Sequence, residues 1–374
     1  MRVVVEKSHL IKAVSRVHRV AERRNTVPIL SNILLRTEGN DKLLLKATDL
    51  EIGVSESLDA TVESMGGTTV PAYIFHDIVR KLPEGTQIVL ALQAHGDTLE
   101  VRSGGAKFLL QTLQESAFAD MSVGGFSHEF CISGKDLKHL LDFTHCAMSS
   151  DETRYQMSGV YLHSVEISNG TTILRAVATD GHRLAKADIP CPQGAFGIPS
   201  IIIPKKAVLE IQKLIDNTNL SIPVGLSSSK LHLKIGPTSL TSKLVDSSFP
   251  NYIAAIPQDN NLHMTVGRIE FSNAVDRVAS IASETIRAVS LKLTKDKLSI
   301  QITSSEYGSA LEELPVKYDG KDLEIGFNAR YLIEIANQLK SEEAIFKFST
   351  PTSAALVHNN NDDNALHVVM PMQV

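Results

Sequence analysis

The chain has 374 residues, 43% of them hydrophobic and 21% charged, and a formal net charge of −5 at pH 7. This ordinary composition excludes a membrane-embedded chain, because no apolar run reaches the length of a membrane span. Three cysteines, Cys131, Cys146 and Cys191, share no CxxC spacing, which argues against a disulfide framework or a zinc site. The N-terminus MRVVVEKSHL lacks the apolar stretch of a signal peptide, so we expect a cytosolic chain with reduced thiols.

Two kinds of helix-like segment each occur three times along the chain. The first kind lies at 5–17, 132–144 and 266–278, and the second at 70–82, 203–215 and 327–339. Such spacing is typical of internal duplication. We therefore predict three equivalent domains with two similarly placed helices each. The six helices are expected at 7–24, 72–82, 133–150, 204–216, 267–283 and 328–340.

Short strand-like runs fill the intervals between the helices. They are β-branched or alternating segments separated by Gly, Asn and Asp turns, for example 42–46, 87–92, 106–110, 230–235 and 297–302. This pattern predicts antiparallel strands, so each repeat is an α+β module. Composition loosens at 119–127 and 258–262, which predicts domains at 1–126, 127–258 and 259–374.

Positive charge is concentrated in the predicted helices. These six segments hold 17 Lys and Arg against 9 Asp and Glu, a net of +8, which leaves −13 on the rest of the chain. The first helix alone contributes +5 through Lys7, Lys12, Arg16, Arg19, Arg23 and Arg24 against Glu22. One basic helix face is usually a solvated surface. Equivalent helices on one concave surface would instead bind a polyanion through its phosphates.

Catalytic signatures are absent from the sequence. It contains no P-loop, HExxH, GxSxG or GxGxxG motif. The strongest candidate is the segment 178–185, where Asp180, His182 and Arg183 could act as an acid–base group. The alternative is a strand–turn–strand, which is favoured because Thr48-Asp49 occupies the matching place in the first repeat without His or Arg. An enzyme built on this segment and a sequence-specific DNA-binding regulator built on helix 7–24 are the two rival interpretations.

The C-terminal segment 367–374 reads HVVMPMQV. It is an ordinary final strand or, since methionine adapts to several partners and Pro371 interrupts strand pairing, part of a groove for linear peptides.

The triplicate design resembles the bacterial DNA polymerase III β subunit family, the sliding clamps. The resemblance rests on TDGHRLA at 179–185, SKLVD at 242–246, FPNY at 249–252, GFN at 326–328 and VVMPM at 368–372, and it extends from Met1 to Val374. It implies a head-to-tail homodimer, that is, a six-domain ring with helices facing a central hole and sheets outside. The joined sheet edges would be the strand around 106–110 and, on the other chain, the strand around 298–302.

The family's function follows from the same resemblance. It implies a bacterial, cytoplasmic and non-catalytic subunit without cofactor or metal, which binds double-stranded DNA without sequence specificity. It tethers the replicative polymerase through its α subunit and is opened by an ATP-driven clamp loader. Other polymerases and repair proteins with clamp-binding motifs would share its partner pocket.

The resemblance also implies site residues. The partner-peptide pocket would comprise Met157, Thr179, Gly181, His182, Arg183, Leu184, Pro250, Asn328, Tyr331, Val368, Val369, Met370, Pro371 and Met372. DNA contacts would fall on Lys12, Arg24, Tyr155, Lys205 and Lys206, and the dimer interface on Lys107, Phe108, Leu109, Ser299 and Ile300. Four positions differ from what the family usually carries near the pocket, namely Ala254, Ala255, Ile286 and Gln373.

Overall fold

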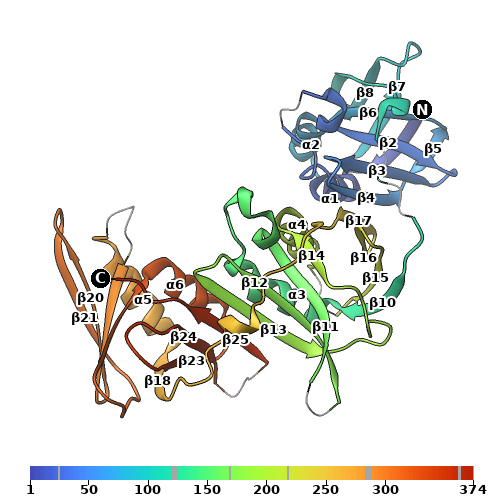
Figure 1. Cartoon of the computed structure of the whole chain (residues 1–374). Helices are drawn as coiled ribbons and strands as arrows, with labels where there is room; N and C mark the ends of the chain where they lie inside the picture. The colour runs from blue at the N-terminus through green and yellow to red at the C-terminus, as the bar shows by residue number, and fades with distance from the viewer. Residues whose placement is uncertain are drawn as a thin grey trace. The chain divides into compact units, whose positions relative to one another are not determined.

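The computed structural model describes the whole chain except residues 24–25, 120, 122–123, 168–169, 217–218, 283–287, 361–363 and 374. Its helices and antiparallel strands alternate along the chain in three successive groups of the same design (Figure 1). This agrees with the predicted fold class of three tandem α+β domains. The predicted boundaries at 126/127 and 258/259 stay predictions, and no helix or strand crosses either of them.

The first domain contains β1 (Arg2–Glu6), α1 (Lys7–Val17), η1 (Pro28–Ser31), β2 (Asn32–Glu38), β3 (Lys42–Thr48), β4 (Ile52–Asp59), β5 (Thr61–Ser64), β6 (Gly67–Pro71), α2 (Ala72–Lys81), β7 (Gln87–Leu92), β8 (Thr98–Ser103), β9 (Ala106–Gln111) and η2 (Glu115–Ala117). The second contains β10 (His128–Ser133), α3 (Gly134–Thr144), η3 (His145–Ala147), η4 (Glu152–Met157), β11 (Gly159–Glu166), β12 (Thr172–Thr179), β13 (Arg183–Pro190), β14 (Ile201–Pro204), α4 (Lys205–Leu214), β15 (Ser221–Leu226), β16 (Lys230–Ile235), β17 (Thr238–Lys243) and η5 (Ile253–Ala255). The third contains β18 (Leu262–Gly267), α5 (Arg268–Ala279), β19 (Ala288–Thr294), β20 (Lys297–Ser304), β21 (Gly308–Pro315), β22 (Leu323–Asn328), α6 (Ala329–Gln338), β23 (Glu343–Phe348), β24 (Ala355–Asn359) and β25 (Ala365–Val369).

All six helices form where the repeats predicted them, but they end earlier. The helix predicted at 7–24 stops at Val17, because the N–H groups of Val20 and Ala21 turn back to carbonyls only three residues away. Within α1, the side chains of Leu10, Val14 and Val17 are buried, three or four residues apart, so they form one core-facing stripe. In the third domain, α5 packs against α6 and contacts β18 of one sheet and β20 and β21 of the other.

Each domain is built from two half-sheets with the same strand order. One half-sheet has the order β1-β7-β8-β9, repeated as β10-β15-β16-β17 and β18-β23-β24-β25. The other has the order β6-β2-β3-β4, repeated as β14-β11-β12-β13 and β22-β19-β20-β21. The internal duplication inferred from the helices therefore extends to every strand except β5, which adds a fifth strand beside β1.

Successive domains are joined by strand pairing. Strand β4 of the first domain pairs with β17 of the second, with Glu56 opposite Thr238 and Ile52 opposite Ser242. Strand β13 of the second domain pairs with β25 of the third in the same way, with Arg183 opposite Val369. We call this pairing of equivalent strands a junction.

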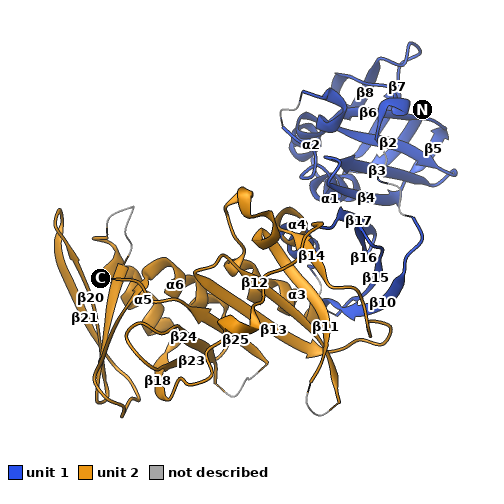
Figure 2. Ribbon diagram, in the orientation of Figure 1, with its two compact units in different colours: residues 1–134, 209–244 blue, residues 135–208, 245–374 orange. Residues whose placement is uncertain are grey.

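The chain forms two compact units, which do not coincide with its three domains, because each junction holds strands of two domains together (Figure 2). Unit 1 comprises residues 1–134 and 209–244, and unit 2 comprises 135–208 and 245–374. Each unit contains one eight-stranded sheet that runs through a junction. The strands of the second domain are therefore divided between the two units.

One predicted sheet edge is wrong. Ser299 and Ile300 lie on β20, which pairs with β19 on one side and with β21 on the other, and Ile300 is fully buried. The edge of this sheet is β21, because the hairpin after β20 adds one more strand. On the other sheet, β9 is an edge strand as predicted, and its Lys107, Phe108 and Leu109 are exposed.

Membrane-spanning helices and metal sites are both absent from the described part of the chain. None of its helices is long and apolar enough to cross a membrane. No group of three or more His, Cys, Asp and Glu side chains within it has the arrangement of a metal site.

Candidate functional site

The turn between β12 and β13 is held by the side chains of Thr179 and Asp180. Thr179 Oγ1 donates to the carbonyl of Arg183 and accepts from the N–H of Gly181. Asp180 Oδ1 accepts from the backbone N–H groups of His182 and Arg183, both at 2.9 Å. Gly181 has a φ of 88°, the left-handed region that glycine adopts without strain.

The turn between β3 and β4 repeats this bonding. Thr48 Oγ1 donates to the carbonyl of Ile52 and accepts from the N–H of Leu50, and Asp49 Oδ1 accepts from the N–H groups of Glu51 and Ile52. The structure therefore confirms that Thr-Asp serves the backbone in both repeats. The difference is that Leu50 adopts a φ of 74°, where the second turn has glycine.

This bonding leaves no acid–base pair in the second turn. Both Asp180 oxygens are engaged, Oδ1 by backbone N–H groups and Oδ2 by Arg183 Nε at 3.1 Å. The His182 side chain is exposed, and within the described residues its ring has no hydrogen-bond partner. The enzyme interpretation therefore has no geometric support at its best candidate.

Strand alternation sorts the predicted pocket residues onto two faces of the sheet, because successive side chains point to opposite faces. Leu184 is paired with Thr179 on one side and with Val368 on the other, so these three share a face. We call it the strap face, because the segment 249–257 (the strap) packs on it through Phe249, Tyr252 and Ile256. We call the opposite one the helix face.

The strap face carries a buried apolar cluster where the sequence predicts the peptide groove, and we call this place the groove region. Val177, Leu184, Tyr252 and Val368 form a buried cluster, against which Phe249 and Leu366 pack. The Phe249 ring stacks on Tyr161 with centroids 4.7 Å apart. Pro250, next in the strap, is exposed.

The C-terminal segment is fixed beside this cluster by two backbone hydrogen bonds. The N–H of Met370 donates to the His182 carbonyl, and the N–H of Met372 donates to the Gly326 carbonyl, both at 2.9 Å. The Met370 side chain is 46% exposed and Pro371 is half-buried. Apolar chain-end residues and the His182 turn are thus brought together although they are far apart in the sequence.

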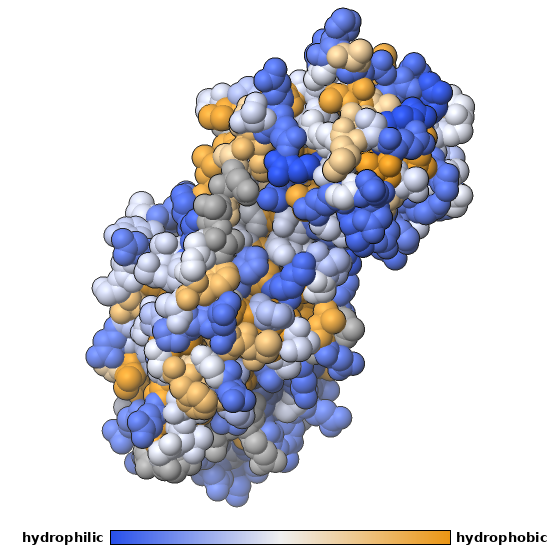
Figure 3. All heavy atoms as spheres, turned by 90° about the vertical axis from the view of Figure 1, so that its right-hand side faces the viewer, coloured by the Kyte–Doolittle hydropathy of each residue, from blue (hydrophilic) through white to orange (hydrophobic). Residues whose placement is uncertain are grey.

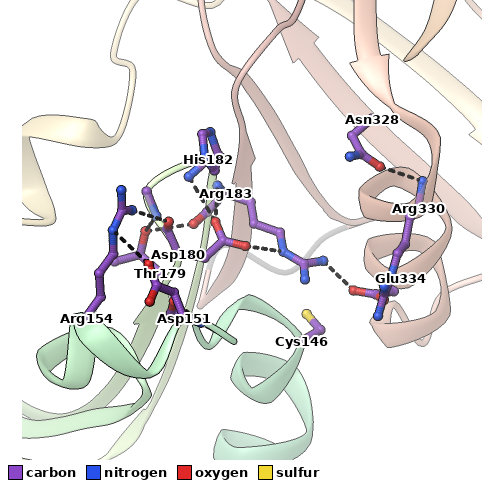
Figure 4. A network of polar contacts seen from close by, with 12 residues as sticks. Cys146, Asp151, Arg154, Thr179, Asp180, His182, Arg183, Asn328, Arg330 and Glu334 are labelled. Carbon is purple, nitrogen blue, oxygen red and sulfur yellow. Dashed lines mark hydrogen bonds and ion pairs between the residues drawn. The ribbon is translucent and has the colours of Figure 1, made fainter. Parts of the chain in front are cut away.

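The helix face carries a polar network centred on Arg183 (Figure 4). Its side chain is only 8% exposed; Nη1 donates to Glu334 Oε2 on α6, and the Cζ atom lies 4.2 Å over the Tyr331 ring. Burial lowers the pKa of Arg183, but hydrogen bonding and the charge of Glu334 outweigh it and raise the pKa overall. For Glu334, burial raises the pKa, and the hydrogen bonds from Arg330 and Arg183 lower it overall.

A polar cavity of about 570 Å³ opens beside this network. It is lined by His145, Cys146, Met148, Ser150, Asp180, Arg183, Lys205, Asn328, Arg330, Tyr331, Glu334 and Gln338. Burial raises the pKa of the Cys146 thiol to about 12, so this cysteine is protonated and unreactive at neutral pH.

Of the residues expected in the peptide groove, one on β13 and one on β25 have side chains on the helix face. Arg183 and Val369 are opposite each other in the β13–β25 pairing, on the face that carries His367, whose ring stacks on Phe143 of α3. Their side chains therefore point to the helix face, and Val369 is fully buried. The sequence motif does not reveal this division, because adjacent motif letters face opposite ways in a strand.

The other predicted pocket residues divide as follows. Asn328 and Tyr331 line the polar cavity, and Asn328 Oδ1 also caps α6 by accepting the N–H of Arg330. Met157 is buried at the end of η4. Of the four positions that differ from the family pattern, Ala254, Ala255 and Gln373 are exposed, and Ile286 lies outside the described residues.

The predicted DNA contacts vary in exposure. Lys12, Tyr155 and Lys206 are exposed, Lys205 is half-buried, and Arg24 lies outside the described residues. Part of the positive charge of the segment 7–24 is already compensated: Arg16 pairs with Glu56 and Asp216, and Arg19 Nε lies 3.6 Å from Glu210. The +8 counted over the helices thus overstates the charge free to act on a polyanion.

Sequence reasoning missed Glu334 and Tyr252 as members of this site. Glu334 is 151 residues from Arg183, and no spacing rule connects them. Tyr252 was identified only as part of the FPNY segment, whereas its ring belongs to the cluster beneath Leu184 and Val368. An aromatic residue in a polar loop was the available signal, since such rings often cover a core.

Comparisons with known proteins cover the entire chain. Residues 1–122, 131–251 and 254–373 match the N-terminal, central and C-terminal domains, respectively, of the DNA polymerase III beta subunit family. Proteins named beta sliding clamp are 40% identical in Caulobacter vibrioides and 34% identical in Escherichia coli K12, and all of each chain is covered.

Solved structures agree with these matches. The Bartonella birtlesii sliding clamp, crystallised with griselimycin, is 44% identical with a TM-score of 0.96, and both chains are covered in full. The Caulobacter crescentus beta sliding clamp is 40% identical with a TM-score of 0.96 over 100% of this chain and 99% of that one. The chain therefore belongs to the bacterial DNA polymerase III beta subunit family, the beta sliding clamps, which are non-catalytic processivity factors of DNA polymerase III.

Proposed function

We propose that two copies of the chain close head to tail into a six-domain ring around duplex DNA in the bacterial cytoplasm. The observation that carries this proposal is the repeated junction. Strand β4 pairs with β17, and β13 pairs with β25. Among the described strands, the equivalent pair still lacking its junction is β21 of the third domain and β9 of the first.

A second copy of the chain can supply each missing partner. Strand β21 of one copy would pair with β9 of the other, and the reverse pairing would close the ring. Such an edge strand is otherwise an aggregation risk, so a dedicated partner is expected. This pairing replaces the interface first expected at Ser299 and Ile300.

The side chains on the two edges suit this pairing. Leu109 on β9 is 57% exposed and Leu311 on β21 is 62% exposed. Exposed apolar residues also occur singly elsewhere, as Figure 3 shows on one face, where they are interspersed with hydrophilic ones. Leu109 and Leu311 differ from these residues because they are exposed on edge strands that have no partner strand on one side. The two edges also carry opposite charges, Lys107 on β9 and Glu313 on β21, although each already pairs within its own sheet, with Glu100 and Lys297 respectively.

The ring would hold DNA by encirclement. Lys12, Arg24, Tyr155, Lys205 and Lys206 would contact phosphates loosely, which gives affinity without reading the base sequence. A sequence-specific regulator, in contrast, would need close base contacts from one helix.

The decisive experiment compares DNA topologies. The chain is loaded onto nicked circular plasmid by a bacterial clamp loader with ATP, and half of the sample is then linearised. Gel filtration should show the chain retained on circles and lost from linear DNA. Equal retention on both forms would contradict encirclement.

The groove region on the strap face is proposed to bind linear peptide segments of the polymerase α subunit, the clamp loader, other polymerases and repair proteins. The buried apolar base under Leu184 and Val368 and the adaptable, exposed Met370 support this role. Arg183 would act from the helix face as a positioning residue for the His182 turn.

Fluorescence anisotropy with a labelled peptide from the polymerase α subunit tests the groove. His182→Ala and Met370→Ala should each weaken binding by about 3- to 10-fold. Met65→Ala is the matched control, since Met65 is exposed in the first domain. Unchanged affinity in both groove variants would overturn the groove and leave the ring untouched.

A further inference from the structure

A second cavity, of about 440 Å³, lies on the strap face. It is lined by Arg175 of β12, Lys186 of β13 and Lys347 of β23, with Tyr252, Ile256 and Leu366 among its apolar walls. Arg175 and Lys186 lie on the same face as Val177 and Leu184, because each is two residues away from one of them along its strand. The cavity and the groove thus share one surface of one sheet.

Positive charge exceeds negative charge in this cavity. Arg175 donates to both oxygens of Asp188, at 2.7 and 2.8 Å, and Lys186 Nζ lies 3.0 Å from the same carboxylate. Lys347 forms no ion pair within the described residues. Three cations line the cavity, the nearby Asp188 carboxylate pairs with two of them, and no acid is among the described lining residues.

The two cations paired with Asp188 are held where water is scarce. The side chains of Arg175 and Lys186 are 14% and 11% exposed. Arg175 also donates to the Tyr252 hydroxyl at 3.2 Å, and that hydroxyl contacts His163 Nε2 at 3.1 Å. These partners fix the guanidinium in place, so an anion entering the cavity would meet a preorganised charge and not a mobile one.

The cavity is continuous with the apolar cluster under the groove. Tyr252 belongs to that cluster, and Ile256 and Leu366 pack against it. Lys186 is two residues from Leu184 along β13, and Arg175 is four residues from Thr179 along β12. At about 3.3 Å per residue, these separations are about 7 to 13 Å. An extended peptide covers that span in two to four residues.

We infer that this cavity holds the carboxylate of an Asp or Glu residue belonging to the same linear peptide whose apolar residues occupy the groove, two to four residues away. The inference rests on the proposed peptide groove and adds to it a determinant of partner choice. The apolar walls suit the methylene part of such a side chain, and Arg175, Lys186 and Lys347 suit its charge. A bulky, fully charged phosphate would leave those walls without a partner.

The test uses the full chain and paired synthetic peptides. Each fluorescein-labelled decapeptide carries two adjacent large apolar residues and either Glu or Gln placed two, three or four residues away, on the N-terminal or the C-terminal side. At one or more spacings, the Glu peptide should bind the unaltered chain about 3- to 10-fold more tightly than its Gln counterpart. The preference should shrink as salt is raised from about 50 to about 300 mM.

Two variants locate the effect. In Lys347→Met and Lys186→Met, the Glu and Gln peptides should bind equally, with the Gln affinity unchanged. Lys317→Met is the control, because Lys317 is 77% exposed and lies outside the cavity, and it should keep the preference. Lys347 forms no ion pair among the described residues, so this variant stays informative even if loss of Lys186 disturbs folding.

Three outcomes overturn the inference. If no spacing favours Glu while His182→Ala still weakens binding, the cavity is not an acidic subsite and the groove stands. If the Glu preference persists in Lys347→Met and Lys186→Met, the carboxylate binds elsewhere. If no peptide of either kind binds, the groove itself is wrong and this inference falls with it.

Discussion

Arg183, the first residue of β13 in the second domain, forms an ion pair with Glu334 on α6 in the third domain. Its Nη1 atom lies 2.5 Å from Glu334 Oε2. Glu334 also accepts from Arg330 at 2.6 Å, but Arg330 is 65% exposed whereas Arg183 is 8% exposed. One carboxylate therefore serves a buried and a solvated arginine.

This contrast yields the first prediction. Arg183→Met should destabilise the surrounding structure by about 2–4 kcal/mol, because Asp180 and Glu334 lose a buried partner. Arg330→Met should cost less than about 0.5 kcal/mol. Hydrogen exchange at the amides of β13 and α6, followed by mass spectrometry, measures both. Equal protection in the two variants would show that the buried Arg183–Glu334 ion pair stabilises the structure no more than the exposed Arg330–Glu334 pair does.

The second prediction concerns the two matching turns. Leu50 adopts a φ of 74° where the other turn has Gly181, and this conformation costs a branched residue about 1–2 kcal/mol. Leu50→Gly should therefore stabilise the chain by about 0.5–1 kcal/mol after the greater freedom of glycine in the unfolded chain is included. Gly181→Leu should do the reverse. Urea denaturation checks the signs; a loss of stability in Leu50→Gly would mean that the leucine side chain contributes more than its backbone costs.

The third prediction tests the edge strands. Leu109→Asp on β9 and Leu311→Asp on β21 should each weaken the dimer by about 100-fold or more, since each places a charge in an apolar contact in both junctions. Sedimentation should then show monomers. An equimolar mixture should recover dimers, because a mixed pair retains one unaltered β9–β21 junction.

Head-to-tail pairing alone gives this rescue. Were β9 to pair with a second β9, Leu311→Asp would have no effect and the mixture would show no rescue. Phe196→Asp is the control, since Phe196 is 56% exposed on the loop between β13 and β14, belongs to neither edge strand, and should leave the dimer intact.

The fourth prediction is a pH dependence. Burial, followed by the charge of Arg183, lowers the pKa of His367 to about 3, and its Nε2 atom has no hydrogen-bond partner among the described residues. Below pH 6.5 the unfolded chain binds a proton that the folded chain excludes, so stability falls as the pH falls from 6.5 towards 3. The slope is about 1.4 kcal/mol per pH unit.

His367→Phe should remove that part of the slope and keep the stacking on Phe143. Urea denaturation of both proteins at pH 7, 6 and 5 should show curves that diverge with acidity. His163, whose pKa burial lowers to about 4, contributes a similar slope and remains as an internal reference in both. Parallel curves would mean that His367 can accept a proton in the folded chain.

Much of the fold was predictable from the sequence because the repeats are long and periodic. Six helices were found from the recurrence of apolar residues, and the Thr-Asp turn was identified as structural by comparing 48–49 with 179–180. The helix ends were less predictable, since the turn after Val17 depends on backbone bonds and not on a Gly or Pro.

The site was predictable only in part, for two physical reasons. Which face a residue occupies depends on strand register, so Arg183 and Val369 were assigned to the groove although they lie on the helix face. Which strand lies at the edge of a sheet depends on whether another hairpin follows it. The sequence therefore predicted β20 as the edge strand, whereas the edge strand is β21. The Arg175–Asp188 pair carries no motif at all and required coordinates.

The recurrence of one junction has a mechanical consequence for a ring built from this chain. Inside each copy, the β4–β17 and β13–β25 ladders are backed by a covalent tether, so a ladder that parts recloses as a unimolecular event. The β9–β21 junction between two copies has no covalent tether, so its reclosure depends on the protein concentration. Opening the ring therefore costs the least free energy at the β9–β21 junctions. A protein that opened the ring by binding either strand would leave the β4–β17 and β13–β25 junctions intact.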